Sequence, residues 1–192
     1  MNRSLWAPLI GALLFVCSSP NTATAAEIPA ETLALCASCH GEAGVPTAAD
    51  IPILWGQEFY YIYVQLKDYK AGLRANETMS GVVADLDKET MQALAQHFSE
   101  QPWPSIGYTA PAYEAGKALA ALSAGQCVQC HLGGYEGNSR IPRMAGQQAD
   151  YLERTMQEFK NKIRLNSAAK GSLLASYSDD DIAAMARYLA GL

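Results

Sequence analysis

Two short motifs of cysteine and histidine are the residues of this chain whose types and spacing predict chemistry. They read CASCH and CVQCH, and their residues are Cys36, Cys39, His40, Cys127, Cys130 and His131. In both motifs two residues separate the thiols and a histidine follows at once, which is the pattern that attaches a c-type haem. The thiols bond to the vinyl groups of the porphyrin, and the imidazole binds its iron from the proximal side. The motifs therefore predict two covalently bound haem c groups.

Disulfide bonds are the other common use of paired cysteines, and four cysteines in an exported chain would allow two. The histidine that follows each pair argues against disulfides, because it belongs to the haem pattern. A fifth cysteine, Cys17, lies near the amino terminus, where lipid attachment is an alternative role. Val16 before it is bulkier than the small residue expected at such a site, so we expect Cys17 to be discarded with the amino-terminal segment.

The first 26 residues have the layout of a signal peptide. Arg3 precedes an apolar run from Leu9 to Val16, and small residues follow around Ala23 to Ala26, as at an A-x-A-like cleavage site. A membrane anchor is the alternative, but the run is far shorter than the about 20 apolar residues that span a bilayer. We therefore predict that residues 1–26 are a cleaved signal peptide. The mature protein is then periplasmic and has no membrane span.

The mature chain is acidic. Without residues 1–26 it carries thirteen Lys and Arg against nineteen Asp and Glu, which gives a net charge of −6. A negative surface is repelled by nucleic-acid phosphates and by anionic membranes. We therefore predict no nucleic-acid partner, and docking to a basic patch on another protein stays possible.

An internal repeat of ninety residues organises the chain. The stretch IPILWGQEFYYIYVQLKDYKAGLRAN from Ile51 returns as IPRMAGQQADYLERTMQEFKNKIRLN from Ile141, and the two cysteine motifs lie ninety-one residues apart. Between the copies, SEQPWPSIGYTAP contains the proline and glycine residues typical of a linker. The repeat predicts domains at residues 27–101 and 112–192, joined by a linker at residues 102–111.

Apolar residues at helical spacing predict a middle and a final helix in each copy. The four stripes are Ile62, Leu66, Tyr69 and Leu73; Met91, Leu94, Ala95 and Phe98; Leu152, Met156, Phe159 and Ile163; and Ile182, Met185, Ala186 and Leu189. Asp87 and Ser178 are expected to cap the two final helices, with Asp181 completing a capping box. A helix is also expected before CVQCH, and less clearly before CASCH. No alternating strand pattern is present, so the predicted fold class is all-α.

Each domain is too small to bury a large core from its own side chains. A haem group would supply the missing apolar mass, and its two thioether bonds would staple the domain around it. We therefore expect each domain to fold poorly without its haem.

The ordered series of CxxCH, P-x-x-x-G-Q and R-x-N motifs resembles the cytochrome c4 family of di-haem class I cytochromes c, over essentially all of residues 27–192. The resemblance implies two cytochrome c folds related by a pseudo-twofold axis, with the haem propionate edges facing each other across the domain boundary. It also implies that the carbonyls of Pro52 and Pro142 accept a proton from His40 and His131, which would orient each imidazole and strengthen it as a ligand. Tyr61 and Tyr151 are expected to be core residues, with a hydrogen bond to haem as the alternative.

Methionine is the usual sixth ligand in electron-carrying cytochromes c, because thioether sulfur favours ferrous iron. Met79 lies seven residues before Leu86. Members of the family that this chain resembles have a methionine at this distance from the final helix. We therefore predict Met79 as the axial ligand of the first haem. A packing role for Met79 is the alternative.

The second copy has Lys170 where the first has Met79, counted back seven residues from Tyr177. We predict Lys170 as the axial ligand of the second haem iron, since metal binding competes with the proton of the amine. The alternatives are a solvated lysine beside five-coordinate or water-bound iron, a lysine in a salt bridge, or Met144 as a substitute ligand. His97 is the one histidine outside the two motifs and is expected at the surface.

The predicted function is electron transfer in the periplasm, between a dehydrogenase and a downstream acceptor, without catalysis by the chain itself. By analogy alone, the altered second site resembles an acceptor subunit for thiosulfate or another sulfur compound. One alternative is a haem enzyme, such as a thiosulfate dehydrogenase or a peroxidase. Another is the haem subunit of a flavocytochrome complex.

Overall fold

The computed structural model describes residues 27–192, so the predicted signal peptide lies outside the described residues. Between residues 27 and 192 the regular structure is helical, apart from one isolated bridge between Asn138 and Ile141. In chain order the elements are α1 (Ala30–His40), α2 (Phe59–Lys70), α3 (Glu77–Val83), α4 (Lys88–Ser99), the 3-10 helix η1 (Ala112–Glu114), α5 (Ala115–Ala124), α6 (Val128–His131), α7 (Ala149–Lys160), α8 (Ala168–Leu174) and α9 (Asp179–Ala190). The predicted all-α fold class is confirmed. None of these helices is long and apolar enough to cross a membrane.

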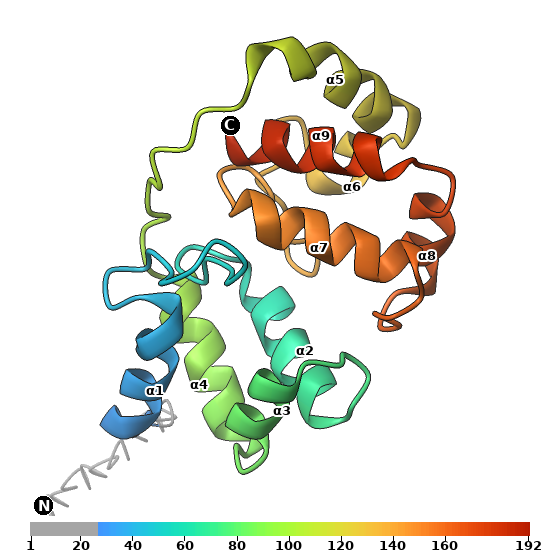
Figure 1. Cartoon of the computed structure of the whole chain (residues 1–192). Coiled ribbons are helices and arrows are strands. Elements are labelled where there is room, and N and C mark those ends of the chain that lie inside the picture. The colour runs from blue at the N-terminus through green and yellow to red at the C-terminus, as the bar shows by residue number, and fades with distance from the viewer. Residues whose placement is uncertain (1–26) are drawn as a thin grey trace, which may run out of the picture.

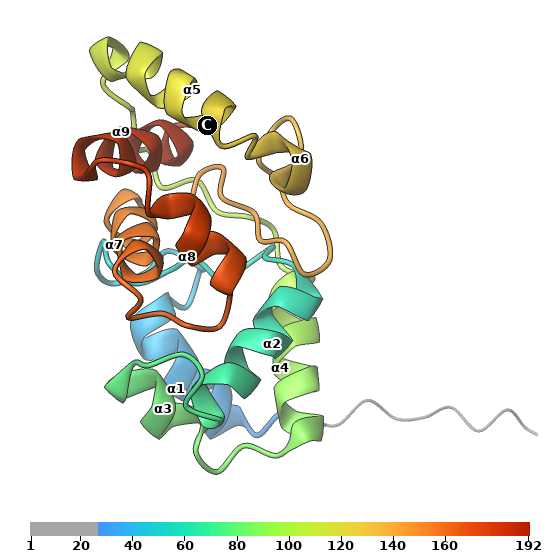
Figure 2. The ribbon, with the colours of Figure 1, turned by 90° about the vertical axis from the view of Figure 1, so that its right-hand side faces the viewer.

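The helices form two units that lie one above the other. Helices α1 to α4 make the first unit, and η1 to α9 make the second (Figure 1). A view turned by 90° separates them in the same way (Figure 2). The helices follow the same order in both units: a helix that carries a cysteine motif, a middle helix, a short helix and a final helix. We keep residues 102–111 as the proposed linker, because α4 ends at Ser99 and η1 begins at Ala112.

Each unit has its own apolar core. In the first unit, α2 packs on α4 around the buried residues Ile62, Leu94, Ala95 and Phe98. In the second unit, α9 packs on both α5 and α7, and the core is larger: Ala121, Leu122, Tyr135, Ala145, Leu152, Phe159, Leu174, Ile182, Met185, Ala186 and Leu189. The stripes of apolar residues seen in the sequence supply most of both sets. The first unit therefore has less core of its own with which to hold its fold.

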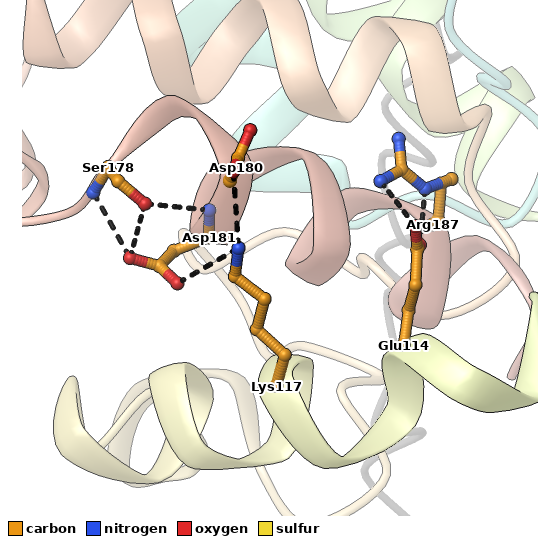
Figure 3. A network of polar contacts seen from close by, with 6 residues as sticks. All are labelled: Glu114, Lys117, Ser178, Asp180, Asp181 and Arg187. Carbon is orange, nitrogen blue, oxygen red and sulfur yellow. Dashed lines mark hydrogen bonds and ion pairs between the residues drawn. The ribbon is translucent and has the colours of Figure 1, made fainter.

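Polar contacts tie the start of the second unit to its final helix (Figure 3). The Arg187 guanidinium on α9 donates to the Glu114 carboxylate, with 2.9 Å between Nη2 and Oε1. The Lys117 ammonium on α5 lies 3.6 Å from an Asp180 oxygen and 3.8 Å from an Asp181 oxygen. Exposed ion pairs of this kind contribute little alone, but together they fix where α5 lies against α9.

The final helices begin at the predicted caps. Asp87 Oδ1 accepts from the Thr90 backbone N–H at 2.7 Å. Ser178 Oγ accepts from the Asp181 N–H at 3.1 Å, while an Asp181 oxygen accepts from the Ser178 N–H at 3.1 Å (Figure 3). This reciprocal pair is the predicted capping box, and it satisfies backbone donors that the first turn of α9 leaves free.

Replacing Ser178 with alanine is expected to destabilise the holoprotein by about 1 kcal/mol, because the capping box is lost. For a chain of this length such a loss lowers the melting temperature by about 2 to 4 °C. Thermal unfolding followed by circular dichroism measures the effect, with Ser123→Ala in α5 as the control. Equal melting temperatures for the two variants would contradict the role given to the cap.

Two reciprocal pairs of hydrogen bonds join the units and display the pseudo-twofold symmetry. The buried amide of Gln147 bonds to both backbone groups of Ile53, with distances of 2.8 Å to the N–H and 3.1 Å to the carbonyl oxygen. The buried amide of Gln57 does the same to Arg143, at 2.8 Å and 3.0 Å. Ile53 and Arg143 are equivalent in the repeat, as are the two glutamines. The glutamine of each G-Q motif therefore joins its own unit to the other unit by hydrogen bonds.

Trp103 from the proposed linker packs against both G-Q motifs. A Cβ added at Gly56 would lie 3.0 Å from the Trp103 backbone N, and one added at Gly146 would lie 3.0 Å from its indole nitrogen. Both glycines also have positive φ values, 69° and 71°, which only glycine adopts readily. The Arg143 guanidinium covers the indole ring, 4.6 Å from its centroid. Glycine at both positions therefore lets the linker lie close to the contact between the units.

Candidate functional site

One cavity of about 770 Å³ reaches from the first unit into the second. Much of its wall is apolar and comes from α2, α4, α7 and α9. The cavity is lined by all the residues that the sequence predicted to hold or orient a haem: Cys36, Cys39, His40, Pro52, Met79, Cys127, Cys130, His131, Pro142 and Lys170. The fold therefore brings the two cysteine motifs and the two candidate distal ligands to one continuous space.

The two motif histidines are held in the same way. His40 Nδ1 lies 2.8 Å from the Pro52 carbonyl oxygen, and His131 Nδ1 lies 2.9 Å from that of Pro142. A carbonyl oxygen has no proton to give, so each Nδ1 must donate, and the lone pair is left on Nε2. Burial lowers the pKa of both imidazoles and keeps them neutral. A neutral ring with a free Nε2 lone pair is the form that binds a metal.

The cysteines lie on or beside the helices that carry these histidines. In the first unit both thiols are on α1, one turn apart and so on one face. In the second unit the helix is broken: α5 ends at Ala124, Gln126 has a positive φ of 50°, and Cys127 caps the short α6. Burial raises the pKa of the Cys36 and Cys127 thiols. Such thiols stay protonated and suit a covalent bond in an apolar pocket.

Met79 and Lys170 occupy equivalent places in the two units. Both are the third residue of a seven-residue helix, Met79 in α3 and Lys170 in α8. The sequence did not predict either helix, because seven residues are too few to show a period. In the first unit, Asn76 caps its helix by accepting from the Met79 N–H at 2.9 Å. This structural equivalence supports the pairing of Met79 with Lys170, which was made by counting back from the final helices.

The Lys170 side chain is half-buried in the second unit and lines the cavity. Its nitrogen is 5.3 Å from the centroid of the Phe159 ring, and burial lowers the pKa of the amine to about 8. Within residues 27–192 the Lys170 nitrogen forms no ion pair and no hydrogen bond. The salt-bridge alternative for Lys170 therefore has no support from the structure. Lys170 and His131 both line the cavity, and the positive charge of Lys170 adds to the burial that lowers the pKa of His131.

Met144 and His97 are less well placed than Lys170 to be the distal ligand in the second unit. Met144 also lines the cavity, but its N–H donates to Tyr135 and it comes two residues after Pro142 on the proximal loop. His97 lies on α4 with its ring edge against Phe98, at 5.2 Å between centroids, and is not among the residues that line the cavity. Within the described residues, Lys170 is therefore the better placed distal group in the second unit.

A buried polar cluster between the units was not predicted from the sequence. Arg74 Nη2 donates to the Tyr151 hydroxyl at 3.1 Å, and Arg164 Nη2 lies 3.5 Å from the Tyr61 hydroxyl. Both guanidiniums also donate to Gln65 Oε1, at 3.0 Å and 2.6 Å. The tyrosines, expected as core packing, thus make polar contacts across the boundary. The repeated R-x-N motif was the available signal, but nothing in it named the partners.

These arginines carry positive charge that lacks an anionic partner. Arg74 is 6 % exposed and Arg164 is 3 % exposed, yet neither forms an ion pair within residues 27–192. Burial raises the pKa of Tyr151, but the two guanidiniums outweigh it and lower that pKa to about 7. Buried charges in proteins are normally paired. The cluster therefore suits negatively charged groups, such as the carboxylates of a haem, at the middle of the cavity.

Comparison with known proteins identifies the family. The model of the family described as cytochrome c matches residues 113–192. Cytochrome c4 of Azotobacter vinelandii is 32% identical over 181 residues, which cover 83% of this chain and 85% of that protein. The chain belongs to the cytochrome c4 family. The crystal structure of reduced recombinant cytochrome c4 from Pseudomonas stutzeri, with 27% identity, superposes with a TM-score of 0.77 and covers 84% of this chain and 95% of that one. The two units are therefore tandem class I cytochrome c domains, as the resemblance implied.

A second kind of relative is also similar. The thiosulfate dehydrogenase electron acceptor of Stutzerimonas stutzeri is 33% identical over 169 residues, 82% of this chain and 78% of that protein. Membership of the cytochrome c4 family implies covalently bound haem c and a part in electron transfer. The residues fit that group, because each cytochrome domain offers a thiol pair, a neutral imidazole and a distal side chain on one cavity, with unpaired arginines between the domains.

Proposed function

We propose that this cytochrome c4 is a periplasmic di-haem electron carrier, which accepts electrons from a redox enzyme and passes them to a downstream acceptor. The observation that carries the proposal is the single cavity on which both sets of haem-binding residues lie. When bound, each haem would supply an iron that takes up and releases one electron. The contacts of Gln57 and Gln147 across the boundary would hold the two sites at a fixed separation.

In the first domain, Cys36 and Cys39 would hold the haem covalently, and His40 and Met79 would bind its iron. The hydrogen bond to Pro52 would fix the orientation of the His40 ring and make it a stronger donor. Thioether sulfur favours ferrous iron and raises the reduction potential. The first site is therefore proposed as the high-potential one.

In the second domain, Cys127 and Cys130 would hold the haem, and His131, oriented by Pro142, would be its proximal ligand. Lys170 would be the distal ligand, supported by its position in α8 and by its location on the cavity. An amine stabilises ferric iron better than a thioether does, so the second site would have the lower potential. Electrons on the second site would then move downhill to the first.

The relative named as an electron acceptor of thiosulfate dehydrogenase favours a sulfur-oxidising enzyme as the donor. Charge supports docking of a basic partner on the first domain, because residues 27–101 carry four Lys and Arg against eleven Asp and Glu. Residues 112–192 carry nine against eight. Within residues 27–192 all four cysteines lie in haem motifs, and the structure has no cluster of three His, Cys, Asp or Glu that would hold a further metal. We therefore propose a carrier rather than an enzyme, with a flavocytochrome subunit as the alternative.

Thiosulfate dehydrogenase with thiosulfate is expected to reduce the purified holoprotein rapidly, while thiosulfate or peroxide alone leaves it unreacted. Stopped-flow absorbance at the haem bands measures the rate, and rising ionic strength should slow it because unlike charges attract the pair. Fast turnover of either substrate by the isolated protein would favour the enzyme alternative. Co-purification of the chain with a flavoprotein would favour the subunit alternative.

Intact-mass measurement of the exported protein is expected to give the peptide beginning near Ala26 or Glu27 plus two haem groups. The reason is that both attachment motifs are complete and that residues 1–26 have the layout of a signal peptide. A mass with one haem would contradict the di-haem proposal. A mass that retains the amino-terminal segment would contradict the predicted cleavage.

A further inference from the structure

The helix that carries the second cysteine motif is followed by a strained residue. Helix α6 ends at His131, and the next residue, Leu132, has a φ of 68° and a ψ of 173°. Glycine adopts this backbone conformation readily, whereas a residue with a side chain adopts it only at a cost in free energy. In the first domain the residue after His40 is Gly41, with a φ of 87°. The second domain therefore has a leucine where the first has the residue that suits the turn.

The backbone on both sides holds Leu132 in this conformation. Its N–H donates to the Val128 carbonyl oxygen at 3.0 Å, and its carbonyl oxygen accepts from the Tyr135 N–H at 3.2 Å. Tyr135 is buried in the second core, which fixes the far end of the turn. These contacts are made by the backbone of Leu132, so a glycine would make the same turn without strain. A strained residue that the turn does not require indicates a function for its side chain.

Leu132 and Val128 expose apolar side chains beside the second cysteine motif, at the edge of the second unit (Figure 2). Leu132 is 37 % exposed and Val128 is 44 % exposed, and neither is among the residues that line the cavity. A haem in the cavity would therefore leave both at the surface. Cys130, between them in the sequence, is also exposed. The first domain has the small residues Gly41 and Ala37 at the two equivalent positions.

The segment around these two residues has no acidic or basic side chain. Residues 118–135 contain no Asp, Glu, Lys or Arg, whereas the equivalent residues 27–44 contain three glutamates. A charged partner surface would lose hydration against residues 118–135 without gaining a counter-charge. Charge complementarity therefore selects a partner whose own docking surface is uncharged and apolar.

We propose that Val128 and Leu132 form a docking face for the electron donor, a redox protein with an uncharged apolar patch around its own electron-transfer site. The inference rests on the proposed function and deepens it, because electrons that move downhill from the second haem to the first must enter at the second domain. Cys130 would hold the second haem at this surface, which brings a docked donor close to it. One electron leaves the donor, and the second haem iron passes from ferric to ferrous. The acidic first domain would still attract positive charge elsewhere on the donor.

Leu132→Gly tests the docking face, because it removes strain and contact together. The holoprotein variant should melt no lower than the wild-type protein and is expected to melt about 2 °C higher, since the strain is relieved. Its affinity for thiosulfate dehydrogenase, measured by isothermal titration calorimetry without thiosulfate, should fall about tenfold, the loss expected for one exposed leucine that docking buries. A packing role for Leu132 predicts the reverse, a lower melting temperature with unchanged affinity.

Val128→Ala removes the other apolar side chain at an unstrained helical position and should also weaken the affinity. Leu73→Ala is the matched control, because Leu73 is an exposed leucine of the first domain that is not among the residues lining the cavity. It should leave the affinity unchanged. Rising ionic strength should slow reduction of the wild-type protein and of Leu132→Gly by the same factor, since salt screens charges and not an apolar contact.

An affinity that Leu132→Gly and Val128→Ala both leave unchanged would overturn the inference. An equal loss in Leu73→Ala would overturn it too, because the effect would then belong to exposed apolar residues in general. Wild-type protein that thiosulfate dehydrogenase neither binds nor reduces would overturn the proposed donor and the inference with it. Wild-type protein that is reduced, with variants that bind as well, overturns the inference alone, so the two failures are distinguishable.

Discussion

Replacing Lys170 with alanine is expected to convert the second haem from low-spin to high-spin and to open its iron to small ligands. Alanine has no donor atom, and Lys170 is the candidate distal group that the structure places on the second-domain side of the cavity in register with Met79. Paramagnetic resonance of the ferric protein should show the loss of one low-spin signal and the gain of a high-spin one. Binding of carbon monoxide to the reduced variant gives a second readout, expected at one site per molecule.

Lys162→Ala is the matched control, because Lys162 is exposed on the loop before α8. It should leave both spectra unchanged. Lys170→Met should restore a low-spin second site and raise its potential towards that of the first, since a thioether replaces the amine. Met79→Lys should lower the potential of the first site. If Lys170→Ala leaves spectrum and potentials unchanged, lysine is not the ligand, and Met144 or water takes its place.

Removal of haem attachment is expected to cost a domain most or all of its stability. A Cys36→Ala, Cys39→Ala variant should lose the cooperative unfolding of the first domain, and a Cys127→Ala, Cys130→Ala variant that of the second. The reason is that the buried side chains of each domain face a shared cavity of about 770 Å³. Without haem these apolar walls would face water, and the loss of their burial is expected to remove much of the about 5 to 15 kcal/mol that stabilises a typical domain.

The two variants should differ in degree. The first domain has the smaller core of its own, so Cys36→Ala, Cys39→Ala should lose more helix than Cys127→Ala, Cys130→Ala. Circular dichroism gives the helix content, and limited proteolysis shows which domain has opened. Either variant unfolding as cooperatively as the wild-type protein would show that the haem is not the main source of core packing.

The sequence predicted α2, α4, α7 and α9 from their apolar stripes, but the prediction that Leu73 and Ile163 end two of these stripes was wrong. Helix α2 ends at Lys70 and α7 at Lys160, and both apolar side chains lie beyond them and are exposed.

The sequence also predicted the caps at Asp87 and Ser178, which depend only on nearby residues. It missed α3 and α8, which are too short to show a period and are held by their place in the fold. Met79 and Lys170 were still recognised as equivalent positions, because their distance from the final helix can be counted in the sequence.

Contacts between the domains could not be predicted in the same way. Gln57 and Gln147 stood out as identical residues of the repeat, but their partners Arg143 and Ile53 come from the other domain. Arg74 and Arg164 were visible only as a repeated motif. A residue's partners across a boundary depend on how two surfaces meet, and the local sequence carries little of that information. The internal repeat showed which residues were equivalent, and only the fold showed what they touch.

We propose that this cytochrome c4 carries two haem groups with different distal ligands, Met79 and Lys170, and so has two different potentials. Potentiometric titration of the wild-type holoprotein, followed by absorbance, tests it most directly. We expect two one-electron steps that are well separated, with the lower step moving towards the upper one in Lys170→Met. A single step, or two steps that Lys170→Met leaves in place, would contradict it.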